Sequence, residues 1–266
     1  MNLIKDETQS AKALAHSTEG AGPLFEPPSG VFVLGELWLW PGFAVSRPQY
    51  SQLLVADVHL GKAAHFRSLG VPVPDQVTEE SLLRLSDLLI RSQAKSLVVL
   101  GDLIHDHRAL SALEPLWAQW RELHAGIEIK LIVGNHDRRS LALLRTQRLT
   151  GLILCEEPYK DQSLWLAHEA KAFAGQVSSD VSPVLGLCGH EHPVISIPDR
   201  SIARRIRRPC FYLDHQHMLH LPAFGSFTGG HPVCLDDCKR IFVDTVDAVQ
   251  ELPLSTIRTR RRNLRS

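Results

Sequence analysis

The chain has no excess of either charge. Its 266 residues include 29 lysines and arginines and 29 aspartates and glutamates, so the formal net charge is zero. This balance excludes a protein that attracts nucleic acid through its overall charge, and any such binding would need local basic patches. No apolar run is long enough to span a bilayer, and the N-terminal segment lacks the apolar core of a signal peptide. We therefore expect a cytoplasmic protein without membrane contact.

Cysteine is also scarce, with five residues at irregular spacing. An odd count of this kind argues against a disulfide framework. Cys234 and Cys238 lie close together in the sequence, but no second pair completes a zinc-ribbon pattern. The sequence therefore predicts five reduced thiols, as is usual in a reducing compartment.

The sequence predicts one folded domain between two polar ends. Residues 1–28 are polar and rich in Gly and Pro and predict a flexible N-terminal arm, whereas residues 251–266 form a basic C-terminal tail. Residues 29–250 contain no linker and no internal repeat, which favours a single α/β domain. In its first half, short apolar runs alternate with apolar residues at helical spacing. The expected order is strand 53–56, helix 75–94, strand 97–100, helix 111–124, strand 128–133 and helix 138–149.

This alternation predicts a parallel sheet with crossover helices. Beyond residue 150 the helical pattern fades, and short apolar runs follow one another. The expected strands lie at 152–155, 164–167, 184–188, 211–213, 218–221 and 240–243. We therefore expect a second sheet packed against the first, with helices on the outside.

Polar side chains gather where these predicted strands end. Asp57 and His59 follow LLVA, and Asp102 follows SLVVLG. Further candidates of the same kind are Asn135 after KLIVG, His168 after LWLA, and His190 and His192 after VLGLC. Alone, each would be read as a capping Asp or a surface His. Together, and directly after apolar strands, they indicate metal ligands, because a buried strand end does not otherwise collect ionisable groups. Oxygen mixed with imidazole nitrogen suits Mn, Fe or Zn better than Mg or Ca.

With these residues placed, the chain resembles the calcineurin-like metallophosphoesterases. DVHLGK, GDLIHD, GNHDR, the isolated His168 and GHEH are similar to the five signature blocks of that family. The resemblance implies a four-layer αββα sandwich, in which helices flank two mixed sheets. It also implies two divalent metal ions, with manganese favoured and iron or zinc as alternatives.

The resemblance assigns a role to each matching residue. One metal ion would be bound by Asp57, His59 and His192, and the other by Asn135, His168 and His190, with Asp102 bridging both. His136 would protonate the leaving oxygen, and Asp137 would orient its ring. Two adjacent cations neutralise phosphate charge and lower the pKa of a bridging water, whose hydroxide can attack phosphorus in line.

A narrower resemblance rests on DVHLGK and on LPAFGSFTGG at residues 221–230. Both are similar to the bacterial ligase-associated DNA damage response endonucleases, which implies a DNA substrate and, as partners, an ATP-dependent DNA ligase and a helicase. One alternative is a hydrolase of small nucleotides or nucleotide-linked pyrophosphates, which the zero net charge favours slightly. Another is a metal-binding scaffold without catalysis, which the complete set of site residues opposes.

Several cations could contact the substrate phosphate. Lys62 and Arg67 follow the first motif on an expected loop, and Arg138 opens a predicted helix beside the site. A cation at a helix N-terminus opposes the macrodipole, which favours an anion nearby. Basic clusters at 204–208 and 257–266 favour DNA slightly, although solvated segments explain them equally simply.

The chain departs from the resemblance in two places. Many relatives have GD-x-x-D, whereas GDLIHD places Asp106 one residue later, so neither Asp106 nor His105 is assigned to the site. Many relatives also have Gly after the isolated histidine, where this chain has Glu169.

Overall fold

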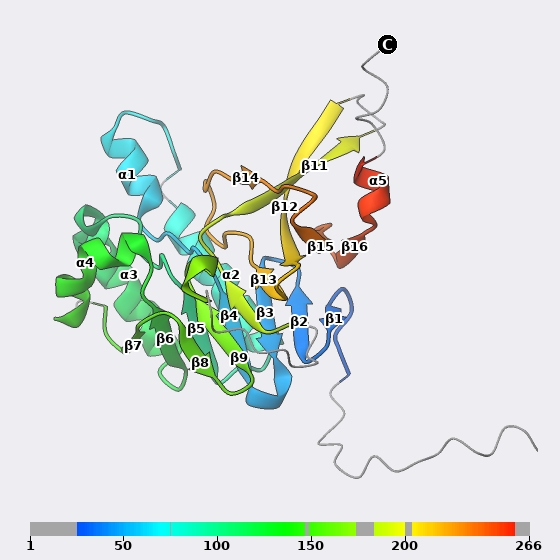
Figure 1. Ribbon diagram of the computed structural model, residues 1–266. Coiled ribbons are helices and arrows are strands. Elements are labelled where there is room, and N and C mark those ends of the chain that lie inside the picture. Colours follow the sequence, from blue (N-terminus) through cyan, green and yellow to red (C-terminus); the bar gives the residue numbers. More distant parts are fainter. Residues whose placement is uncertain (1–25, 75, 147–148, 174–183, 200–203, 259–266) are drawn as a thin grey trace, which may run out of the picture.

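The computed structural model describes residues 26–258 except 75, 147–148, 174–183 and 200–203 (Figure 1). The N-terminal arm expected at residues 1–28 therefore lies outside the described residues apart from its last three. The same applies to residues 259–266 of the basic tail. No helix among the described residues is both long and apolar enough to cross a membrane. The five cysteines are free, as expected from their spacing.

The first half of the chain forms a seven-stranded sheet in sequence order. Its strands are β1 (Phe32–Leu34), β2 (Leu37–Trp40), β3 (Ala44–Arg47), β4 (Gln52–Val55), β5 (Ser96–Leu100), β6 (Glu128–Ile132) and β7 (Leu152–Cys155). Strands β1 to β4 pair antiparallel, whereas β4 to β7 pair in parallel. Helices α2 (Val77–Arg91), α3 (Leu110–Leu123) and α4 (Asn135–Arg145) connect the parallel strands. The carboxyl ends of β4, β5 and β6 consequently meet at one edge, where open α/β sheets place ligand sites.

The second half forms a nine-stranded mixed sheet. Its strands are β8 (Tyr159–Asp161), β9 (Leu164–Ala167), β10 (Gly186–Cys188), β11 (Pro193–Asp199), β12 (Arg204–Asp214), β13 (Met218–His220), β14 (His231–Pro232), β15 (Cys238–Asp244) and β16 (Val249–Leu252). The order is β14-β11-β12-β13-β10-β9-β8, and β15 pairs with β12 and β16. Strand β10 runs parallel to β9 and β13.

Three apolar layers hold the elements together. Leucines of α2 and the buried Trp117 of α3 cover one face of the first sheet. The other face packs against the second sheet through residues such as Leu54, Val98 and Phe211. The far side of the second sheet meets the short helix α5 (Leu254–Arg258) and the 3-10 turn η3 (Ala170–Phe173). The expected αββα sandwich is thereby confirmed.

The expectation that Lys62 and Arg67 lie on a loop is wrong. These residues form helix α1 (Lys62–Ser68), which starts after Gly61 at a φ of 81°. Ala63 and Phe66 pack against Val73 and Val77. This contact lies outside the short segment itself, so local periodicity could not reveal the helix.

One buried arginine joins the two sheets away from the edge where the carboxyl ends of β4, β5 and β6 meet. Arg47 of β3 is 0% exposed and forms ion pairs at 3.3 Å with Glu36 and Asp161, the latter in β8 of the second sheet. It also donates to the Ser163 hydroxyl at 3.1 Å. A buried guanidinium of this kind depends on its partners, because an unpaired buried charge is strongly destabilising.

Candidate metal centre

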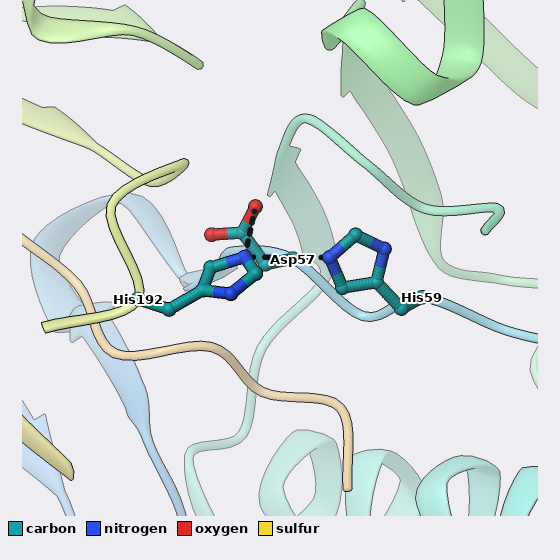
Figure 2. Close-up of side chains that lie close together, drawn as sticks. All are labelled: Asp57, His59 and His192. Carbon is teal, nitrogen blue, oxygen red and sulfur yellow. Dashed lines mark hydrogen bonds and ion pairs between the residues drawn. The ribbon is translucent and has the colours of Figure 1, made fainter. Parts of the chain in front are cut away.

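The first group of convergent side chains contains Asp57, His59 and His192, whose ligand atoms lie within 4.8 Å of one another. Figure 2 shows the three side chains pointing toward a common position. His192 Nε2 lies 3.2 Å from Asp57 Oδ1 and 3.3 Å from His59 Nε2. Asp57 follows β4 in the first sheet, whereas His192 precedes β11 in the second. The group therefore spans the two sheets.

The second group shares Asp57 with the first and adds Asp102 and His168, again with ligand atoms within 4.8 Å. His168 Nε2 lies 3.5 Å from Asp102 Oδ2 and 2.8 Å from Asn135 Oδ1. His190 Nδ1 lies 3.1 Å from His168 Nε2. The structure thus brings all seven residues proposed as metal ligands into one cluster.

The backbone of the cluster adopts left-handed conformations at several residues. Five of its residues adopt positive φ values between 46° and 70°, in a region that residues with a Cβ rarely occupy: Asp57, His59, Asp102, His190 and His192. Strained backbone of this kind persists where the surrounding structure fixes it, commonly at functional sites.

Glycines leave room for the cluster. A Cβ at Gly189 would lie 2.6 Å from Asp57 Oδ2, and one at Gly134 would lie 2.6 Å from the Asp102 nitrogen. A Cβ at Gly101 would collide with the His168 ring. Any larger residue at these three positions would push a candidate ligand out of place.

The polar atoms of the cluster fit a metal ion. Asp57 Oδ1 is buried and has no hydrogen-bond partner of suitable geometry, although unsatisfied buried polar atoms are rare. The Nε2 atoms of His59 and His192 lie on the same side of the cluster, 3.3 Å from each other. Burial lowers the pKa of His59 far below its usual value, and the charge of Lys62 lowers it further. The imidazole is therefore neutral at pH 7, which is the form that binds a metal. Burial raises the pKa of Asp102, and the Asp57 charge raises it further while His168 opposes the shift. Two carboxylates that disfavour each other's charge are the arrangement that a cation between them would stabilise.

The expected pairing of Asp137 with the His136 ring is wrong. The Asp137 carboxylate is fully buried and accepts hydrogen bonds from the backbone N–H groups of Asp102 at 2.7 Å, Gly134 at 3.1 Å and Ile104 at 3.2 Å. His136 Nδ1 instead lies 2.9 Å from the carbonyl oxygen of His105. Asp137 therefore anchors the loops that carry candidate ligands, because a carboxylate with three amide donors at hand satisfies them first. Burial raises its pKa to about 6, against the effect of these hydrogen bonds.

The three predicted phosphate contacts differ in their surroundings. Lys62 is half-buried near Asp57 and Asp102, and burial lowers its pKa despite both carboxylates. Arg67 donates to the carbonyl oxygens of Val73 at 3.2 Å and Pro74 at 2.9 Å, so it closes the loop after α1. Arg138 pairs with Glu157 at 2.8 Å, and half of its side chain remains exposed.

His105 belongs to the site although the sequence left it unassigned. Its ring stacks on His136 with centroids 5.1 Å apart and contacts His59 and His65 at 5.4 and 5.2 Å. Burial lowers its pKa to about 4, and the charge of Lys62 contributes. The one-residue shift in GDLIHD concealed this position.

The two other departures lie at the margin of the site. Asp106 pairs with Arg108 at 2.7 Å and approaches His65 at 3.6 Å. Glu169 pairs with the exposed Lys171. Neither belongs to the two groups of convergent ligands.

A second polar network supports the segment between His190 and His192, and no sequence motif indicates it. Glu191 accepts a hydrogen bond from the Tyr212 hydroxyl at 2.5 Å and lies 3.4 Å from His220 Nδ1. His220 stacks on Tyr212 with centroids 4.1 Å apart and reaches Asp214 at 3.2 Å. Burial lowers the pKa of His220, but the neighbouring Cys188, Asp214 and Glu191 more than offset it and raise the pKa to about 12.

Comparison with known proteins bears on this geometry. The model of the calcineurin-like phosphoesterase family matches residues 51–246, which include every candidate ligand. The chain belongs to this family. Its members are phosphoester hydrolases, so the expected enzyme class is confirmed.

A solved structure adds a more specific likeness within the calcineurin-like phosphoesterases. The crystal structure of the nuclease MPE from Pseudomonas putida shares 32% sequence identity with this chain and superimposes with a TM-score of 0.63. The match covers 85% of this chain and 100% of the nuclease. No curated protein is significantly similar in sequence.

Proposed function

We propose that this phosphoesterase is a phosphodiesterase that depends on two divalent metal ions and cleaves DNA. The observation that carries the proposal is the convergence of two carboxylates, an amide and four imidazoles at one edge of both sheets. The similarity to a nuclease over that protein's whole length supports DNA as the substrate. Residues 29–250 would form the catalytic domain.

The proposed ligand sets follow the clusters. Asp57, His59 and His192 would hold one ion, and Asn135, His168 and His190 the other, with Asp102 between them. Manganese is the ion proposed first, with iron and zinc as alternatives, because the donors mix oxygen with imidazole nitrogen. When bound, the ions would neutralise phosphate charge and activate the attacking water.

The chain's own residues would perform the remaining work. His136 lies at the N-terminus of α4 with its Nδ1 held by the His105 carbonyl. Because that carbonyl accepts a hydrogen bond from Nδ1, the ring in its imidazolium form would carry its second proton on Nε2. The departing oxygen would take up this proton, which leaves the ring neutral. Lys62 and the exposed Arg138 would contact phosphate oxygens, whereas Arg67 would act through the position of α1.

One experiment tests the proposal first. Hydrolysis of bis-p-nitrophenyl phosphate and of the monoester should be measured with added Mn²⁺ for the wild type and for His136→Ala. We expect diester cleavage, and a loss of about 10²- to 10⁴-fold in kcat for the variant. The exposed His215→Ala is the matched control and should cleave normally. If the wild type binds manganese but cleaves neither compound, the proposal fails.

A small-nucleotide hydrolase is the second candidate. A cavity of about 380 Å³ opens beside His190 and is lined by Glu191, Tyr212, His231 and Asp237, among others. This volume lies within the usual range of small-molecule sites. The salt dependence of substrate binding distinguishes the two candidate functions, because binding to a DNA backbone weakens steeply between 50 and 200 mM salt. Partnership with a DNA ligase and a helicase, and a role in DNA repair, stay predictions from the resemblance.

A further inference from the structure

A basic two-stranded ribbon rises from the metal centre. It consists of β11 and the part of β12 at residues 204–209, which pair antiparallel. Strand β11 begins at Pro193, directly after His192. Figure 1 shows the two strands extending beyond the rest of the second sheet. The chain therefore places an extended element directly beside a proposed metal ligand.

The two faces of this ribbon differ in chemistry. Residues opposite each other in an antiparallel pair share a face, and so do residues two apart on a strand. Arg207 lies opposite Ser196, and Arg205 opposite Pro198, so both arginines lie on one face. Ile195 lies on the opposite face and packs into the core of the second sheet. The arginine face is thus the one left outside that core.

The described partners of both arginines are neutral. Arg205 donates to the hydroxyl of Ser196 at 3.0 Å and to the Ser196 carbonyl, and Arg207 donates to the Gly230 carbonyl. Both side chains are exposed. Neutral acceptors orient a guanidinium without compensating its charge, so the face presents two aligned cations. In a chain of zero net charge, this is a local patch of the kind that attracts a polyanion.

Hydrogen bonds connect this face with the metal centre. The Gly229 carbonyl lies 3.2 Å from His192 Nδ1, and the next residue, Gly230, accepts from Arg207. The backbone N–H of His231 donates to the His192 carbonyl at 3.1 Å. Arg207 therefore lies near the site and Arg205 farther out along the same line.

We propose that the face carrying Arg205 and Arg207 binds the phosphate backbone of DNA that flanks the cleaved bond. This inference rests on the proposed function and adds the position of the flanking strand. Along β11, Ser196 and Pro198 lie roughly 10 and 17 Å beyond Pro193, at 3.3 Å per residue. With an axial rise of 3.4 Å per nucleotide, the arginines would contact phosphates about three and five nucleotides from the metal centre.

The test compares substrates that reach the ribbon with substrates that do not. The kcat/KM should be measured at 50 to 200 mM salt for a DNA oligonucleotide of about 20 nucleotides, a dinucleotide and bis-p-nitrophenyl phosphate. In Arg205→Ala/Arg207→Ala, we expect a lower kcat/KM for the long DNA. The salt slope, that is, the slope of log kcat/KM against the logarithm of the salt concentration, should be shallower by about 1.4 to 1.8 because two phosphate contacts are lost. The dinucleotide and the small diester should be cleaved as by the wild type.

Two further variants separate charge from structure. Arg205→Lys/Arg207→Lys keeps both charges and should keep the salt slope. Lys95→Ala/Arg145→Ala removes two exposed cations outside the ribbon, one before β5 and one at the end of α4, and should behave as wild type. An unchanged slope in the double alanine variant of the ribbon, with intact small-diester cleavage, would overturn the inference. Absence of small-diester cleavage in the wild type would instead overturn the proposed function.

Discussion

Replacement of Asp137 by Asn tests what this buried carboxylate does. Three backbone N–H groups, those of Asp102, Gly134 and Ile104, donate to it at 2.7 to 3.2 Å. A hydrogen bond to a charged group contributes about 1.5–3 kcal/mol. In Asp137→Asn one oxygen can keep the Asp102 and Gly134 amides, but the new NH₂ group faces the Ile104 amide. We expect the free energy of unfolding to fall by about 2–4 kcal/mol, because one bond is lost and two lose their charge.

The same substitution should weaken metal binding. Asp137 binds the backbone of Asp102 and of Gly134, which directly precedes Asn135 at the start of α4, and both Asp102 and Asn135 are proposed ligands. Loss of a group that orients a ligand typically reduces metal affinity about 10- to 100-fold, or about 1.4–2.8 kcal/mol. This range agrees with the loss of one charged hydrogen bond.

Two measurements check the expectation. Urea unfolding of the metal-free protein gives the free energy of unfolding, and a calorimetric titration with Mn²⁺ gives the metal affinity. Asp87→Asn is the matched control, since Asp87 forms an exposed ion pair with Arg91 on α2 and such pairs contribute about 0–1 kcal/mol. The reasoning is refuted if Asp137→Asn binds Mn²⁺ and unfolds as the wild type does and changes only the pH profile of kcat. That result would mean that the three amide hydrogen bonds of Asp137 do not hold the candidate ligands in place.

Three further predictions follow from other contacts. Arg47→Met leaves Glu36 and Asp161 without their buried partner. A urea titration should show a free energy of unfolding that is lower by about 3–5 kcal/mol, whereas the rate of diester cleavage per folded molecule should be normal. Gly134→Ala places a Cβ against Asp102, so calorimetry should show weaker manganese binding, while far-ultraviolet circular dichroism should be unchanged. His220 has a pKa raised to about 12 from 6.5, so its stabilising effect is complete below pH 6.5 and declines as the pH rises toward 12. The difference in unfolding free energy between wild type and His220→Gln should therefore shrink from pH 6 to pH 9, and a constant difference would contradict the assignment.

The strand-end residues that form the cluster could be located from the sequence because two local signals coincide there. Apolar runs such as LLVA and LWLA mark buried strands, and the polar residues directly after them have to lie at the sheet edge. The same signals located Asp57, His168 and most strands of both sheets, because each of these depends mainly on neighbouring residues.

The remaining features depend on contacts between distant segments. Asp137 finds its amide partners Asp102 and Ile104 across 35 and 33 residues, and only the fold brings them together. Helix α1 is seven residues long, too short to form on its own periodicity. The positions of His105 and His220 likewise depend on packing against rings from other elements.

Each proposed ion would take ligands from both halves of the chain. Asp57 and His59 come from the first sheet and His192 from the second, and Asn135 comes from the first sheet whereas His168 and His190 come from the second. Bound metal ions would then link two sheets that are hydrogen-bonded separately. An ion at a hundred times its Kd adds about 2.7 kcal/mol to the folded state. Removal of the ions by a chelator should therefore first make the two sheets separate more easily. This would be seen as faster proteolysis between the two sheets than in the metal-bound protein.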